Sequence, residues 1–316
     1  MMNENEPISK SNGSLDVLQN ICLQSIKEQR RARRWGIFFK LLLAVYVLVV
    51  LIAMIPGRHS VIDGPHTAWI QLHGTIGTED EINARGVRES LHQAFENQDS
   101  RAVILEINSP GGSPVQAGQI NDEIYRLKGL HPDKPVYAVV SDICASGGYY
   151  IAVAADKIFV DKASIVGSIG VILNGFGFVE AMQKLGVERR IIASGRHKAM
   201  LDPFSPPDKK VNDHVRQQVQ KIHDQFVKVV ERGRGDRLLA SDEVYSGLFW
   251  TGEEAINLGL ADDFGTVESV ARELIGEERL VDYSESRDLI DRIGREIGIR
   301  LQSVFSANTP LMPDFL

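Results

Sequence analysis

Residues 102–155 read AVILEINSPGGSPVQAGQINDEIYRLKGLHPDKPVYAVVSDICASGGYYIAVAA and repeat one pattern twice. An apolar run, 102–107 and then 135–141, leads into a turn with two glycines, and each turn leads into a segment of helical period. Runs that are apolar on both faces are typical of strands buried inside a parallel sheet. The stretch therefore predicts an α/β domain in which helices connect parallel strands.

The same alternation continues on both sides of this stretch. Further strands are predicted at 67–72, 158–160 and 187–193, and helices at 80–96, 114–128, 146–155, 177–185 and 209–232. The last of these carries apolar side chains at steps of three and four, which predicts one long amphipathic helix. We expect one domain over 67–275, followed by a helical extension and tail at 276–316.

Composition excludes several classes of protein. The chain has 316 residues, of which 43% are hydrophobic and 24% charged, as expected of a folded protein rather than a disordered one. Its formal net charge of −7 argues against a nucleic-acid binder, which needs a basic face. Cys22 and Cys144 are the only cysteines, so neither a disulfide framework nor a cysteine-rich zinc site is expected.

The N-terminal region predicts a membrane anchor. Residues 36–55, GIFFKLLLAVYVLVVLIAMI, form an apolar run interrupted only by Lys40, long enough to span a bilayer as a helix. Five Lys or Arg residues between 27 and 34 precede it, so the charge rule places residues 1–35 in the cytoplasm as a basic tail. Residues 56–66 would form a linker. The C-terminal domain would then lie outside the cytoplasm.

The two glycine turns are candidate sites for chemistry. A helix N-terminus leaves backbone N–H groups unpaired, and glycine lets another group approach them, so such turns can stabilise an oxyanion. Ser146 is the best candidate nucleophile because it stands between a strand and a glycine pair. The alternative is that Ser146 only caps the helix.

The candidate base is less clear from the residues alone. His197, His214 and His223 have no evident Asp partner, which gives weak support to a histidine base. A lysine that is desolvated can accept the serine proton instead, because burial lowers the pKa of an amine. The lysines that could serve are Lys157, Lys162, Lys184 and Lys198. Among them Lys198 lies in a glycine-bearing loop that leads into apolar residues.

The sequence resembles the S49 family of serine endopeptidases, in the short bacterial form of the signal peptide peptidase A type. The resemblance rests on stretches that occur in the family's order between residues 67 and 275: NSPGG at 108–112, ASGGYY at 145–150, ADKI at 155–158, IVGSIGV at 165–171, GRHK at 195–198, TGEEA at 251–255 and LGLAD at 258–262. It implies that Ser146 is the nucleophile, that Lys198 is the general base and that Ser168 orients the lysine. Backbone N–H groups of Gly111 or Gly112 and of Gly147 would form the oxyanion hole.

The resemblance also implies a fold and partners. The family's fold is similar to that of the Clp protease and crotonase superfamily, which is built from repeated ββα units. The resemblance further implies a ring-like homo-oligomer, in which the serine and the lysine of one site come from adjacent subunits. Expected substrates are peptides such as cleaved signal peptides, and no cofactor or metal is expected.

Two other interpretations stay open at this stage. A crotonase-like enzyme acting on acyl-CoA would use the same pair of glycine turns to stabilise an enolate. A membrane-tethered scaffold could keep a peptidase fold without catalysis. Labelling of Ser146 by a fluorophosphonate would favour the peptidase.

Overall fold

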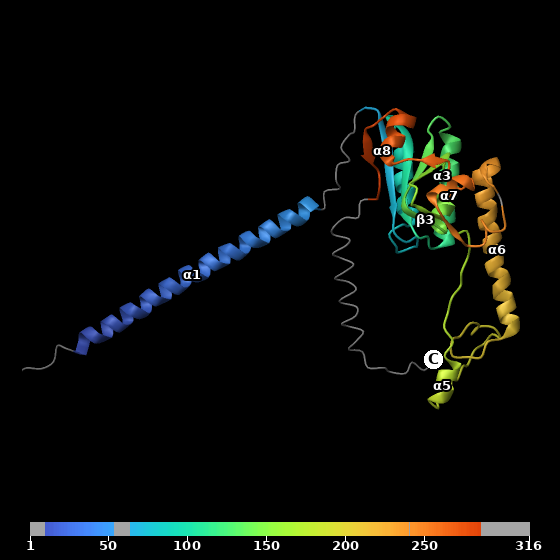
Figure 1. Ribbon diagram of the computed structural model, residues 1–316. Coiled ribbons are helices and arrows are strands. Elements are labelled where there is room, and N and C mark those ends of the chain that lie inside the picture. The colour runs from blue at the N-terminus through green and yellow to red at the C-terminus, as the bar shows by residue number, and fades with distance from the viewer. Residues whose placement is uncertain (1–9, 54–63, 240, 286–316) are drawn as a thin grey trace, which may run out of the picture. The chain divides into compact units, whose positions relative to one another are not determined.

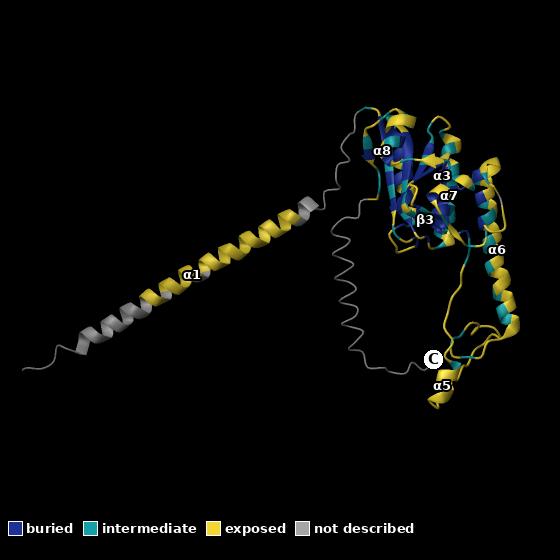
Figure 2. Ribbon diagram, in the orientation of Figure 1, coloured by how far each residue is buried: buried dark blue, intermediate teal, exposed yellow. Residues whose placement is uncertain are grey.

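The computed structural model describes residues 10–53, 64–239 and 241–285, which fall into two compact units (Figure 1). The described part of the first unit is a helix, α1 (Lys10–Ala53), which includes most of the predicted basic tail and most of the apolar run. Its large apolar side chains from Trp35 to Val49 are exposed (Figure 2). Within the described residues no helix meets the length and apolarity required to cross a bilayer. The predicted anchor, 36–55, ends outside the described residues.

The second unit is built on one mixed sheet. Its strands, in chain order, are β1 (His66–His73), β2 (Ser100–Ser109), β3 (Val136–Ala145), β4 (Lys157–Val160), β5 (Ile165–Gly167), β6 (Phe249–Thr251), β7 (Asp263–Phe264) and β8 (Leu280–Asp282). The order across the sheet is β6-β5-β3-β2-β1-β8, and β4 pairs with both β3 and β7. All pairs are parallel except β5 with β6. The predicted α/β class with parallel strands is therefore confirmed.

Helices connect these strands. They are α2 (Ala84–Glu96), α3 (Pro114–Leu130), α4 (Gly147–Ala152), α5 (Val179–Lys184), α6 (Lys209–Arg234), α7 (Gly252–Asn257) and α8 (Val267–Ser269), with a 3-10 turn at Gly235–Arg237 and a π-helix at Val270–Ile275. Local sequence explains the helix starts: Ser113 caps α3 in front of Pro114, and Asp208 caps α6.

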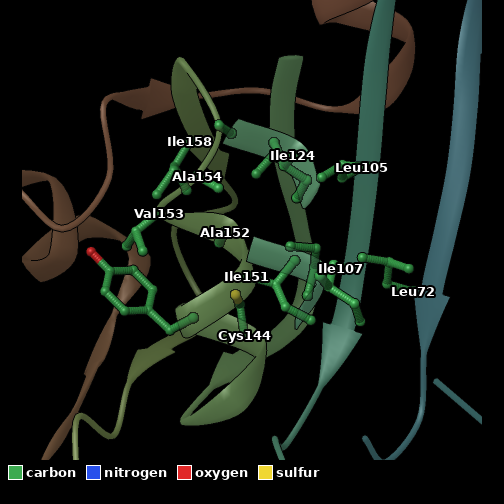
Figure 3. Packing of buried hydrophobic residues seen from close by; sticks show 14 of the residues in the cluster. Leu72, Leu105, Ile107, Ile124, Cys144, Ile151, Ala152, Val153, Ala154 and Ile158 are labelled. Atoms are coloured by element: carbon green, nitrogen blue, oxygen red, sulfur yellow. The ribbon is translucent and has the colours of Figure 1, made fainter. Parts of the chain in front are cut away.

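The core lies where the central strands meet α2, α3 and α4. Side chains of β2 such as Leu105 and Ile107 have essentially no exposed surface, and they contact Ile124 of α3 and Ile151 of α4 (Figure 3). A smaller apolar cluster around Ile104 lies on the other face of the sheet, under the π-helix. Burial on both faces is why β2 and β3 are nearly continuous apolar runs.

The structure differs from the prediction in several places. The predicted strand at 187–193 is wrong: these residues have no regular structure and are exposed. The short strands β5 to β8 were missed, and β8 lies beyond residue 275, the predicted end of the domain. Of the helical extension and tail predicted at 276–316, residues 286–316 lie outside the described residues.

One segment extends away from the sheet. Residues 171–208, which include α5, run from the end of the sheet to the N-terminal end of α6, whereas the C-terminal half of α6 packs on the core through Phe226 and Val230 (Figure 1). We call residues 171–208 the extension. Many of its apolar side chains are exposed, including those of Ile172, Phe176, Leu185 and Ile192.

Candidate active site

Ser146 lies at the junction of β3 and α4 in an unusual backbone conformation. Its φ of 51° and ψ of −117° belong to a region that favours glycine. The Ser146 N–H donates to the carbonyl of Gly167 at 2.8 Å, which ties the turn to the end of β5. Although Ser146 is the N-cap of α4, its side chain makes no capping hydrogen bond. Its hydroxyl is therefore available for chemistry rather than used as a cap.

Two backbone N–H groups beside Ser146 have no partner within residues 10–53, 64–239 and 241–285. Gly147 is the first residue of α4, and its N–H donates to no other described residue. In the facing turn, Gly111 donates its N–H to the Ser109 hydroxyl at 3.1 Å, whereas the Gly112 N–H has no described partner. A Cβ on Gly147 would lie 3.2 Å from the Gly112 nitrogen, so the two groups are neighbours. Of the predicted donors, Gly111 is occupied, whereas Gly112 and Gly147 donate to nothing in the part of the chain that the structure describes.

Glycine is required in the facing turn for a geometric reason. Gly111 has a φ of 104°, and a Cβ there would lie 2.8 Å from the Gly147 nitrogen and from the Ser146 Cβ. A Cβ on Gly112 would lie 2.1 Å from the carbonyl oxygen of Ile76. No L side chain fits at either position, so the turn can contact the start of α4 only through bare backbone.

Ser168 lies next to Ser146 at the ends of two adjacent strands. Ala145 and Gly167 are register partners in the β3–β5 pair, so the residues that follow them leave the sheet together. Ser168 also has a positive φ, of 50°, and its N–H donates to the Leu248 carbonyl at 2.8 Å. The structure therefore brings Ser146 and Ser168 together at the C-terminal ends of β3 and β5.

Lys198 lies elsewhere in the same chain. It is exposed, within the extension. Its neighbours His197 and Ala199 share a pocket with Asn212, near the start of α6, whereas Phe226 of α6 lines a pocket with Ser146. From Asn212 to Phe226 the helix rises by about 20 Å. The Ser146 hydroxyl and the Lys198 amine of one chain are therefore not in contact.

A small pocket opens beside Ser146. It has a volume of about 150 Å³ and is mostly apolar; its lining residues include Tyr150, Gly170, Ile172, Ile222 and Phe226. The tilted rings of Tyr150 and Phe226 lie 5.0 Å apart between centroids. No sequence motif marks this pocket, although Ile222 and Phe226 belong to the predicted apolar stripe of 209–232.

A network of buried polar side chains links α4 to residues 259–262 and to the end of α6. The hydroxyl of Tyr149, a fully buried residue, donates to the Leu260 carbonyl at 2.8 Å. Arg234, also buried, donates to the Gly259 carbonyl at 2.7 Å and to both carboxylate oxygens of Asp262, at 2.8 and 3.0 Å. The network connects the end of α6 to the helix that begins beside Ser146.

Comparison with known proteins places this geometry in a family. The model of Peptidase family S49 matches residues 129–280, which include Ser146, Ser168 and Lys198. The chain is 34% identical over 221 residues to a protein of Enterococcus faecium named "Putative signal peptide peptidase SppA", covering 67% of this chain and 64% of that one. The chain belongs to peptidase family S49.

Other similar proteins are longer than this chain. Protease 4 of Haemophilus influenzae is 34% identical over 203 residues, 63% of this chain and 32% of that one. A Brucella abortus protein named Na(+)/H(+) antiporter NhaA is 39% identical over 241 residues, 74% of this chain and 33% of that one. The chain thus spans between a third and two thirds of the length of these relatives.

Among solved structures, a ClpP1 mutant from Listeria monocytogenes matches 62% of this chain and 90% of its own, with 16% identity and a TM-score of 0.39. The repeated ββα organisation expected from the family stays a prediction.

Proposed function

We propose that this S49 member is a serine endopeptidase in which Ser146 is the nucleophile and the N–H groups of Gly112 and Gly147 hold the oxyanion. One observation carries the proposal. The Ser146 hydroxyl is not used as a helix cap, and it stands beside two neighbouring N–H groups that have no partner among the described residues. Acyl transfer needs this combination, because negative charge develops on the carbonyl oxygen next to the nucleophile.

The reaction would proceed in two halves. The Ser146 Oγ bonds to the scissile carbonyl carbon, its proton passes to a base, and the carbonyl oxygen becomes an oxyanion that accepts the two N–H bonds. Collapse breaks the peptide C–N bond, and the base returns the proton to the leaving amine. Water then attacks the acyl-enzyme in the same way and releases the carboxylic acid and free Ser146.

The proposed base is Lys198 from a second copy of the chain. Lys198 of the same chain lies too far from Ser146, and the extension that carries it exposes apolar side chains that a neighbouring copy would cover. A ring-like homo-oligomer in which each site combines Ser146 of one subunit with Lys198 of the next accounts for both observations. Ser168 would accept or donate a hydrogen bond that orients the incoming amine.

The proposed substrates are apolar peptides close to a membrane. The pocket beside Ser146, of about 150 Å³, accommodates a small or medium apolar side chain. Helix α1 exposes apolar side chains along its length from Trp35 to Val49, which supports an anchor at 36–55 in a bacterial plasma membrane. With the N-terminus in the cytoplasm, the catalytic unit would lie outside it and act on cleaved signal peptides.

The test is peptide cleavage by the full-length chain and its variants. Ser146→Ala should lose cleavage and fluorophosphonate labelling together. Lys198→Arg should be as inactive as Lys198→Ala, because a guanidinium stays protonated and cannot accept the serine proton. Ser168→Ala should retain weakened activity. A Lys198→Arg chain that cleaves at the wild-type rate would remove Lys198 as the base, and labelling that persists in Ser146→Ala would remove the nucleophile.

A further inference from the structure

Part of the extension has the sequence of a strand but no strand partner. Residues 187–193, VERRIIA, carry three β-branched side chains, a composition that favours strands. Yet none of the N–H groups of residues 188–193 donates a hydrogen bond to another described residue. The side chain of Ile192 is fully exposed and that of Val187 is 55% exposed. A single strand is not stable in water by itself, so this segment lacks the sheet edge that it needs.

The sheet has an unpaired edge on β6. This strand pairs with β5 on one side, and within the described residues no strand pairs with its other side. The side chains of Phe249 and Leu248, at and just before the start of β6, are 64% and 51% exposed. An exposed, apolar edge strand is a template for pairing with another chain.

The charges of the two segments are complementary. Residues 184–198 contain five Lys or Arg and one Glu, and all of them are exposed. Residues 241–254, which include β6, contain four Asp or Glu and neither Lys nor Arg. Opposite charges on two such surfaces speed their encounter and select against the wrong pairing of each surface with itself.

We infer that residues 187–193 of one copy add to the free edge of β6 in a second copy. The contact joins two different surfaces, so it is head-to-tail, and successive copies close into a ring if the rotation between them allows it. It buries the apolar side chains of 187–193 against Leu248 and Phe249. It also pairs Arg189 and Arg190 with the acidic residues near β6.

This contact deepens the proposed function, because it explains how a second copy could supply the base. The Ser168 N–H donates to the Leu248 carbonyl, so the start of β6 lies directly beside the site. Lys198 follows Ala193 by five residues, which span at most about 17 Å when extended. A segment docked on β6 therefore holds its Lys198 within reach of the neighbour's Ser146. Only this last step rests on the proposed function, since the docking itself depends on shape and charge.

Photo-cross-linking of the full-length chain tests the contact without using activity. p-Benzoylphenylalanine in place of Ile192 should give cross-linked dimers and larger species on irradiation, and their cross-linked peptides should fall within residues 239–251 of a second chain. The matched control carries the same group in place of Leu130, an apolar residue of α3 that is 62% exposed. It should give no cross-link to 239–251. Cross-links from position 192 that map elsewhere, or only within one chain, would overturn the inference.

Charge exchange gives a second test with assembly as its measurement. Two double variants reverse the charge of one surface each. The first carries Arg189→Glu with Arg190→Glu, and the second carries Asp242→Lys with Glu243→Lys. Each should associate at least about tenfold more weakly than wild type by light scattering, since like charges then face each other. A mixture of the two should associate as wild type, because every contact again joins opposite charges. Lys198→Ala should assemble normally, because the docking does not depend on its amine. A failure of Lys198 as the base would therefore change cleavage and leave assembly unchanged. Normal assembly of the separate variants, or no recovery in the mixture, would contradict the contact.

Discussion

Ser146 holds a backbone conformation that costs free energy. A non-glycine residue with a φ of 51° and a ψ of −117° is strained by about 1–3 kcal/mol. The strain is stored at the residue whose hydroxyl must face the substrate. It is held in place by the hydrogen bond from Ser146 N–H to the Gly167 carbonyl and by the packing of α4.

Replacing Ser146 should therefore reveal this strain. Ser146→Gly and Ser146→Ala should both be inactive, but the glycine variant should be more stable by about 1 kcal/mol, because glycine adopts the conformation without a Cβ clash. Thermal unfolding of the two variants provides the measurement. Equal stability of the two variants would show that the turn is not strained.

Gly147 offers a test of the proposed oxyanion hole. Gly147→Ala keeps a helical backbone, but its Cβ would lie 3.2 Å from the Gly112 nitrogen and should displace that N–H. We expect kcat to fall by about a hundredfold, as when one oxyanion donor is lost, with little change in Tm. The matched control is Gly129→Ala in α3, where a Cβ would meet nothing within 4 Å. Unchanged kcat in Gly147→Ala would exclude this pair of donors.

At the scale of elements, a charged cluster connects α2 to α3. Glu123 of α3 is buried and contacts Arg126 of its own helix and His92 of α2. Hydrogen bonds from Arg126 lower the pKa of Glu123 from 4.5 to about 2, with His92 adding to the effect. Because the folded carboxyl has the lower pKa, its stabilising contribution is complete above pH 4.5 and is lost as the pH falls toward 2.

Glu123→Gln should accordingly lower the Tm at pH 7, and the difference from wild type should shrink between pH 4.5 and about pH 2. The measurement is thermal unfolding by circular dichroism across that pH range. Glu273→Gln, which removes an exposed partner of Arg272, is the control and should change the Tm little at any pH. A constant difference between wild type and Glu123→Gln would contradict the lowered pKa.

The buried Arg234–Asp262 pair joins α6 to the turn behind α4. Asp262→Asn should destabilise the fold by about 3–5 kcal/mol, because it leaves the Arg234 guanidinium, only 1% exposed, without its countercharge. Chemical denaturation measures this loss. The same substitution class on the surface, Glu188→Gln beside Arg190, should cost less than about 1 kcal/mol. A similar small effect at Asp262 would mean that the pair contributes only to packing.

For the assembled protein, the proposed function predicts that each site is shared between two copies, because Ser146 and Lys198 of one chain lie apart. Equimolar mixing of inactive Ser146→Ala and inactive Lys198→Ala chains should then restore cleavage. About a quarter of random head-to-tail contacts would join an intact serine to an intact lysine. Peptide cleavage by the mixture, after subunit exchange, is the measurement. Mixed oligomers that form but stay inactive would refute the shared site.

The central strands, the helices between them and the two glycine turns can be predicted from the residues alone. These features follow from local properties: β2 and β3 are buried on both faces, and the turns at 111–112 and 146–148 need residues that allow unusual backbone angles. The nucleophile could be chosen from the same local pattern. The sequence also shows that Lys198 lies in a glycine-bearing loop. It does not show how far Lys198 lies from Ser146.

The state of each backbone donor and the missing partner of the extension, within the described residues, depend instead on how the chain folds. Gly111 and Gly112 are equivalent in sequence, but the hydroxyl of Ser109 occupies one N–H and leaves the other open, which depends on how the chain folds back. Residues 187–193 have the sequence of a strand, yet strand formation requires a partner edge, and no described strand pairs with them. Hydrogen bonds between distant segments depend on the arrangement of the whole chain, so residue preferences alone do not predict them.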